Sequence, residues 1–145
     1  MTISRRHAYI AAPFLAAFLL AGAPASAEMQ KFKADLKGSA EVPPNTSKGK
    51  GSLEATYDTA TKKLTYTVTY SDLTGPATAA HFHGPAAPTA NAGVALGATG
   101  PLASPIKGEA TLTDAQAADL QAGRWYFNIH TDAHKPGEIR GQVVK

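Results

Sequence analysis

The chain has 145 residues, the length of about one domain, and 43% of them are hydrophobic. It contains no cysteine, which excludes disulfides, thiolate metal ligands and catalytic thiols. The formal net charge is only +3, and no cluster of lysine or arginine follows the first residues. The composition therefore argues against a nucleic-acid-binding protein.

The first 27 residues have the three parts of a secretory signal. Arg5 and Arg6 form a basic start, residues 8–22 are apolar, and Ala-Ser-Ala at 25–27 matches a cleavage site. We expect cleavage after Ala27, which leaves one domain of residues 28–145 with a formal net charge of +1 and no stable membrane anchor. The expected location is therefore the periplasm or the outside of the cell.

Two other interpretations of this segment have less support. Residues 8–27 are about as long as a bilayer-spanning helix, but Pro13 and the Ala-Ser-Ala site argue against an uncleaved anchor. Paired arginines occur in twin-arginine signals, but nothing else in the segment indicates that pathway. General secretory export is the prediction.

Beyond this segment, apolar and polar residues alternate in seven short stretches, and a period of two is typical of half-buried strands. The first stretch is followed by Pro43 and Pro44, which lack the donors of a sheet ladder and predict an edge or a corner. A turn at residues 58–61 joins the second and third stretches and predicts a hairpin. The predicted strands cover residues 30–38, 51–57, 64–70, 77–83, 106–112, 124–131 and 137–144.

Two other segments separate these strands. Residues 84–105 are rich in proline and glycine and predict a functional or loosely ordered loop, interrupted only by an apolar stretch at 94–96. Thr113 and Gln116 have the spacing of a capping box before an alanine-rich run, which predicts one short surface helix ending near Gly123. The whole pattern predicts an all-β, antiparallel sandwich or barrel with one short helix.

Four histidines follow residue 27, and two of them form a His-x-His pair, His81 and His83. Because strand side chains alternate, both imidazoles leave the sheet on the same face. His130 lies on the polar side of another predicted strand, and pairing of the two strands would bring three nitrogen ligands together. Such a set suits one Cu(II) or Zn(II) ion, and affinity trends favour copper. His134 and Asp132, in the turn after His130, are further candidate ligands.

The alternative is that these histidines only form hydrogen bonds at a polar rim. Nucleophilic catalysis has little support, because the chain has no cysteine and no serine in a Gly-x-Ser-x-Gly motif. Glu41 and Glu138 are a conceivable carboxylate pair. However, Arg140 follows Glu138 on the same strand face, which favours a structural ion pair or hydrogen-bond cluster. The sequence leaves open whether the protein is an enzyme and favours a non-catalytic role.

Four separated motifs occur along the chain: GSAEVPP at 38–44, AHFHGP at 80–85, YFNIHT at 126–131 after an Ala-Gly at 122–123, and PGEIRGQ at 136–142. Their order and spacing resemble the chordin, or CHRD, domain family across residues 30–144. The resemblance implies a domain that is repeated in chordin, an extracellular antagonist of bone morphogenetic proteins, and that occurs singly in exported bacterial proteins. It also implies an immunoglobulin-like β-barrel with limited similarity to copper/zinc superoxide dismutase, and no settled activity.

The similarity to the dismutase suggests copper at the His-x-His pair. A dinuclear centre of that kind needs about six histidines and an aspartate, whereas only four histidines follow the signal. Two classes of function therefore stay open. The first is an exported domain that binds one copper or zinc ion, and the second is a non-catalytic interaction module without metal, whose partner would be an unidentified envelope protein.

Overall fold

The computed structural model describes residues 27–145. The predicted signal, residues 1–27, lies outside the described residues except for Ala27, and the same holds for the alternative of an uncleaved anchor at residues 8–27. No helix in the described part of the chain is long and apolar enough to cross a membrane.

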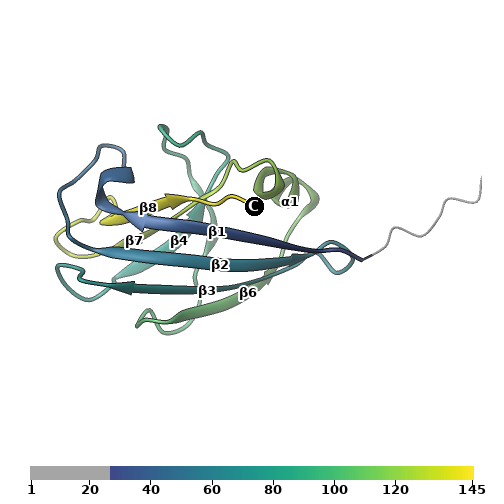
Figure 1. Cartoon of the computed structure of the whole chain (residues 1–145), viewed down its shortest axis with the longest axis horizontal. Coiled ribbons are helices and arrows are strands. Elements are labelled where there is room, and N and C mark those ends of the chain that lie inside the picture. The colour runs from purple at the N-terminus through teal and green to yellow at the C-terminus, as the bar shows by residue number, and fades with distance from the viewer. Residues whose placement is uncertain (1–26) are drawn as a thin grey trace, which may run out of the picture.

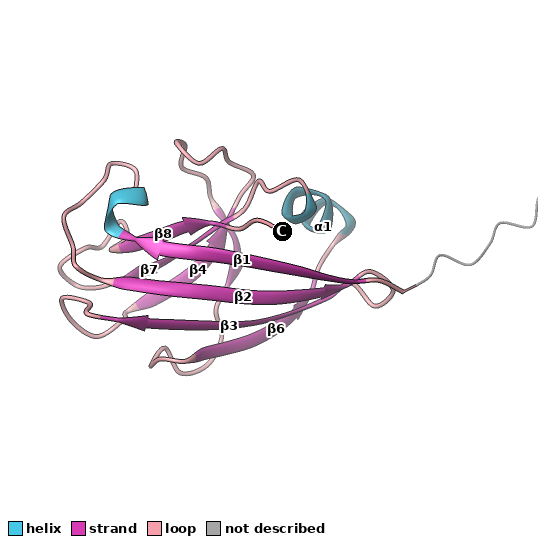
Figure 2. Ribbon diagram, viewed as in Figure 1, coloured by secondary structure: helices cyan, strands magenta, loops and turns pink. Residues whose placement is uncertain are grey.

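All eight strands that the structure describes belong to one antiparallel sheet, which curls into a half-barrel (Figures 1 and 2). Their order is β5-β4-β7-β8-β1-β2-β3-β6, so the first and last strands in sequence are neighbours, with Lys37 of β1 paired to Arg140 of β8. The predicted all-β fold with one short helix is confirmed. The elements are β1 (Met29–Lys37), η1 (Gly38–Ala40), β2 (Lys50–Asp58), β3 (Lys63–Ser71), β4 (Ala79–His83), β5 (Val94–Gly97), β6 (Ile106–Thr111), α1 (Asp114–Gln121), β7 (Tyr126–His130) and β8 (Ile139–Gln142).

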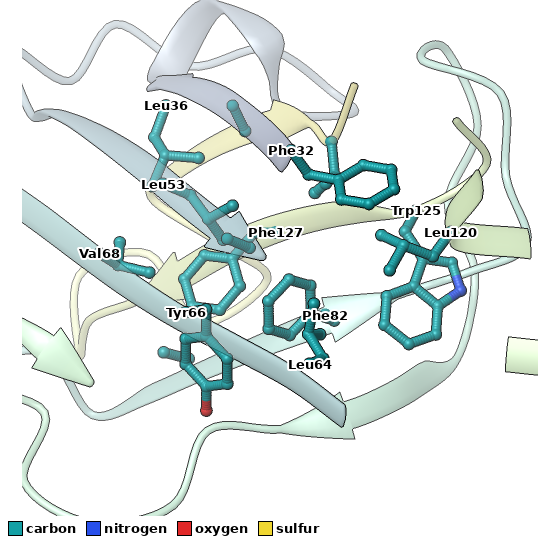
Figure 3. Packing of buried hydrophobic residues seen from close by; sticks show 14 of the residues in the cluster. Phe32, Leu36, Leu53, Leu64, Tyr66, Val68, Phe82, Leu120, Trp125 and Phe127 are labelled. Atoms are coloured by element: carbon teal, nitrogen blue, oxygen red, sulfur yellow. The ribbon is translucent and has the colours of Figure 1, made fainter. Parts of the chain in front are cut away.

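The hydrophobic core fills the inside of the curl, between the layer of β1, β2 and β3 and the layer of β4, β7 and β8 (Figures 1 and 3). Phe82 packs edge-on against Tyr66 and Phe127, with ring centroids 5.0 and 4.8 Å away. Trp125 and Leu120 close one end of the core. Burial of each such side chain stabilises the fold by about 1.5–3 kcal/mol.

The short helix forms as its capping box predicts. Thr113 accepts a hydrogen bond from the amide of Gln116, and the Gln116 side chain accepts one from the amide of Thr113. Leu120 is fully buried, so the helix covers the end of the core with one face. Gly123 follows with a φ of +68°, a conformation that glycine adopts without strain and that ends the helix.

Residues 84–105 are more ordered than a loose loop. They contain β5, which pairs with β4 and forms one edge of the sheet. Tyr70 also donates a 2.6 Å hydrogen bond from its hydroxyl to the carbonyl of Leu102. This edge strand was not predicted because the only apolar stretch in the proline- and glycine-rich segment is three residues long, at 94–96.

Candidate metal site

The outer face of β4, β7 and β8 carries polar side chains, opposite the face that packs in the core. In the sheet ladder, Ala79 of β4 lies opposite His130 of β7, and His81 lies opposite Asn128. Since His81, Asn128 and His130 all point away from the core residue Phe82 and its neighbours, they share one face. The strand pairing required for a three-histidine site is therefore present.

His81, His83 and His130 form one cluster, in which the candidate ligand atoms all lie within 4.8 Å of one another. The closest pair is His81 Nδ1 and His130 Nε2, at 3.1 Å. Two nitrogens bound to one ion at about 2.0–2.1 Å lie roughly 2.8–3.4 Å apart for square-planar to tetrahedral angles. The separation of this pair therefore fits shared coordination of one ion.

Main-chain carbonyls orient two of the three rings. His83 Nδ1 lies 3.0 Å from the carbonyl oxygen of Ala92, and His130 Nδ1 lies 2.8 Å from that of Lys135. A carbonyl accepts hydrogen bonds, so each Nδ1 must carry the proton and each Nε2 keeps its lone pair. His83 Nε2 is buried and makes no hydrogen bond of normal geometry, although the Asn128 side chain lies beside the ring. Its lone pair is therefore available to a metal ion.

The surroundings favour the neutral, metal-binding form of the His-x-His pair. Burial lowers the pKa of His81, and the nearby His130 and His83 lower it further. Burial is also the main cause of the lowered pKa of His83, although the carbonyl of Ala92 and the side chain of Asn128 oppose it. Both rings therefore stay neutral at a lower pH than free histidine does.

His134 does not join this cluster, although it was a predicted ligand. It lies in the turn after β7, where its backbone amide donates to the carbonyl of Thr131, and its carbonyl accepts from Gly137. Asp132 in the same turn is exposed and also lies outside the group of three. A role for either residue as a fourth ligand stays a prediction.

Beside the histidines lies a buried polar cluster of Glu41, Asn128 and Arg140, each at most 6% exposed. Burial raises the pKa of Glu41 to about 7, although Arg140 and Asn128 act in the opposite direction. The Arg140 guanidinium lies 3.4 Å above the ring centre of Tyr126. Sequence reasoning placed Arg140 with Glu138, whereas the structure places it beside Glu41.

Glu138 belongs to a separate network. Its carboxylate accepts hydrogen bonds from the hydroxyls of Ser47, Thr74 and Thr131 and from the amide of Thr74, at 2.6–2.8 Å. Burial raises its pKa, but these hydrogen bonds outweigh burial and leave the pKa below its usual value. Of the two structural roles expected for Glu138, the hydrogen-bond cluster is therefore confirmed. No ion pair between Glu138 and Arg140 occurs in the described part of the chain.

The fold and this site define an all-β domain with a three-histidine cluster on the outer face of its sheet. The profile of the CHRD domain family matches residues 32–143. The chain therefore belongs to the CHRD domain family, as its motifs indicate. No curated protein and no solved structure matches it.

Proposed function

We propose that this CHRD domain is exported and binds one copper or zinc ion through His81, His83 and His130. One observation supports the proposal above the others: the buried Nε2 atom of His83 has no hydrogen-bond partner, while its Nδ1 atom is held by a carbonyl. A histidine at a polar rim would direct both nitrogens to hydrogen-bond partners or water. A ring that is fixed on one side and free on the other is typical of a metal ligand.

The ligand set favours copper over zinc. Three neutral imidazoles without thiolate suit Cu(II) and Zn(II), and a given nitrogen site binds Cu(II) more tightly than the neighbouring divalent metals. His81 and His130 are only partly buried, so water or a small ligand has access to a further coordination position. The proposed role is therefore capture or handling of one metal ion in the cell envelope.

Export is part of the proposal for two reasons. Residues 1–27 have the basic, apolar and small-residue order of a secretory signal. A cysteine-free site built from histidine also keeps its ligands in an oxidising compartment, where thiols would form disulfides.

Elemental analysis of the protein purified from its own envelope, without added metal, tests this function. We expect about one copper or zinc ion per chain, and none in a variant with His81, His83 and His130 all changed to alanine. Equal, negligible metal in both proteins would contradict the proposal and favour the non-catalytic interaction module.

A further inference from the structure

A strap of residues 84–93 crosses the outer face of β4, β7 and β8 and reaches the histidine cluster. Its two ends meet where the amide of Gly84 donates to the carbonyl of Gly93 at 3.2 Å. Near the second end, Ala92 supplies the carbonyl that orients His83. The position of the strap therefore determines where the Nε2 atom of His83 points.

Arg140 of β8 holds this strap at three points. One guanidinium nitrogen donates to the carbonyls of Ala90 and Pro88, at 2.7 and 3.4 Å. Another donates to Oδ1 of Asn91 at 2.8 Å. The planar, branched guanidinium is suited to several fixed acceptors, whereas a lysine offers one flexible ammonium.

Asn91 extends the same connection to the other side of the strap. While its Oδ1 accepts from Arg140, its Nδ2 donates to the carbonyl of Val42 at 2.8 Å. Glu41, the residue before Val42, lies near Arg140 and balances part of its buried charge. Residues far apart in the sequence thus fix the strap against the sheet.

A second connection from Arg140 to His83 passes through Tyr126 of β7. Arg140 lies over one face of the Tyr126 ring at 3.4 Å. The Tyr126 ring is stacked on His83 with the centroids 4.9 Å apart and the planes 4° from parallel. The Tyr126 hydroxyl also lies 3.3 Å from the amide and 3.4 Å from the carbonyl oxygen of Ala92.

We infer that Arg140 is a positioning residue for the metal site: it fixes the strap and the Tyr126 ring, which together aim the Nε2 atom of His83 at the ion. The inference rests on the proposed metal-binding function for its effect on affinity. Its effect on the orientation and tautomer of His83 exists without metal.

Two variants separate positioning from general stabilisation of the fold. Arg140→Met removes the guanidinium while keeping much of its apolar volume, but it also leaves Glu41 without its charge partner. Asn91→Ala removes the two hydrogen bonds of the Asn91 side chain, to Arg140 and to Val42, but leaves the contacts of Arg140 with Pro88 and Ala90. Asn91 is exposed, so this variant keeps the core and the buried charges. Ser52→Ala is the matched control, because it removes an exposed hydrogen bond to Thr69 on β2 and β3.

Nitrogen-15 NMR of the histidine rings in the metal-free protein gives the first readout. In the wild type we expect His83 with its proton on Nδ1, and in folded Arg140→Met and Asn91→Ala we expect a mixture of tautomers. The Ser52→Ala control should match the wild type. The inference is wrong if His83 keeps its proton entirely on Nδ1 in the folded Asn91→Ala variant. Where Arg140→Met also folds, the same result is required of that variant.

Copper(II) titration with electron paramagnetic resonance gives the second readout. Loss of a group that orients a ligand typically weakens metal binding by about 10-fold or more. We therefore expect the Kd for copper to rise by at least about 10-fold in Arg140→Met and by a smaller factor in Asn91→Ala. The copper hyperfine splitting should change in both variants. Unchanged Kd and spectrum in the folded variants would overturn the inference. A wild type that binds no copper would contradict the proposed function instead, and the tautomer of His83 would still test the positioning.

Discussion

His81 and His130 lie on neighbouring strands with Nδ1 of the first 3.1 Å from Nε2 of the second. Because His130 Nδ1 donates to the Lys135 carbonyl, His130 Nε2 has no proton. In the metal-free protein, His81 Nδ1 must therefore donate the hydrogen bond between them. An ion bound to both atoms takes the place of that proton, which moves to Nε2 of the neutral His81 ring. Protons compete with the metal where acid converts the imidazoles to imidazolium, which has no lone pair to bind an ion.

Metal affinity should fall in acid, but at a lower pH than for isolated histidines. The reason is that burial lowers the pKa of both His81 and His83 from the ordinary value of 6.5, so their lone pairs persist below it. Titrations of copper into the protein in non-coordinating buffers from pH 8 to pH 4 measure this. An affinity that stays constant across the whole range would show that these imidazoles are not the ligands.

Glu41 should make the fold less stable as the pH rises through the neutral range. Its pKa is 4.5 in an ordinary environment and about 7 in the folded protein, so the folded state binds this proton more tightly than the unfolded state. The resulting stabilisation is complete below pH 4.5 and disappears as the pH rises through 7, with a magnitude on the order of 3 kcal/mol.

Comparison with Glu41→Gln isolates this effect from other titrating groups. Urea unfolding at a series of pH values should show the stability of the wild type relative to the variant falling between about pH 4.5 and pH 7. A constant difference between the two proteins would contradict the raised pKa.

Replacing Ser47 with alanine should lower the free energy of unfolding by about 1.5–3 kcal/mol, the range for a hydrogen bond to a charged group. The Ser47 hydroxyl donates a 2.6 Å hydrogen bond to the Glu138 carboxylate. Thr46→Ala changes an exposed neighbour and should alter stability by less than about 0.5 kcal/mol. Similar losses in both variants would argue against a structural role of the Glu138 network.

The effect of Ser47→Ala should shrink in acid. The pKa of Glu138 lies below its usual 4.5, so the carboxylate and its contribution to stability persist above that pH and are lost as the pH falls through the lower value in the folded protein. Denaturation at pH 7 and at about pH 3 measures the change.

Export predicts a defined start of the protein in the cell envelope. Its N-terminal sequence should begin at Glu28, because cleavage is expected after Ala27. Recovery of chains that begin at Met1 in the membrane fraction would instead support an uncleaved anchor.

The sequence predicted the shared face of His81 and His83, because strand alternation alone requires it. It did not determine that β4 pairs with β7, since strand order depends on the whole core. His130 was therefore predicted as a ligand only on the condition that these two strands pair. The carbonyls of Ala92 and Lys135 had no sequence signal, because every residue has a main-chain carbonyl. Arg140 was misassigned because its close neighbour Glu138 turns to Ser47, Thr74 and Thr131, whereas the distant Glu41 lies beside it.

The most direct test is calorimetric titration of copper and zinc into the purified protein and into a variant with His81, His83 and His130 changed to alanine. We expect the wild type to bind one ion per chain, copper more tightly than zinc, and each single alanine variant to bind more weakly than the wild type. Loss of the signal in the triple variant would support a site made of these three side chains. If the wild type binds neither ion better than the triple variant, the metal site does not exist.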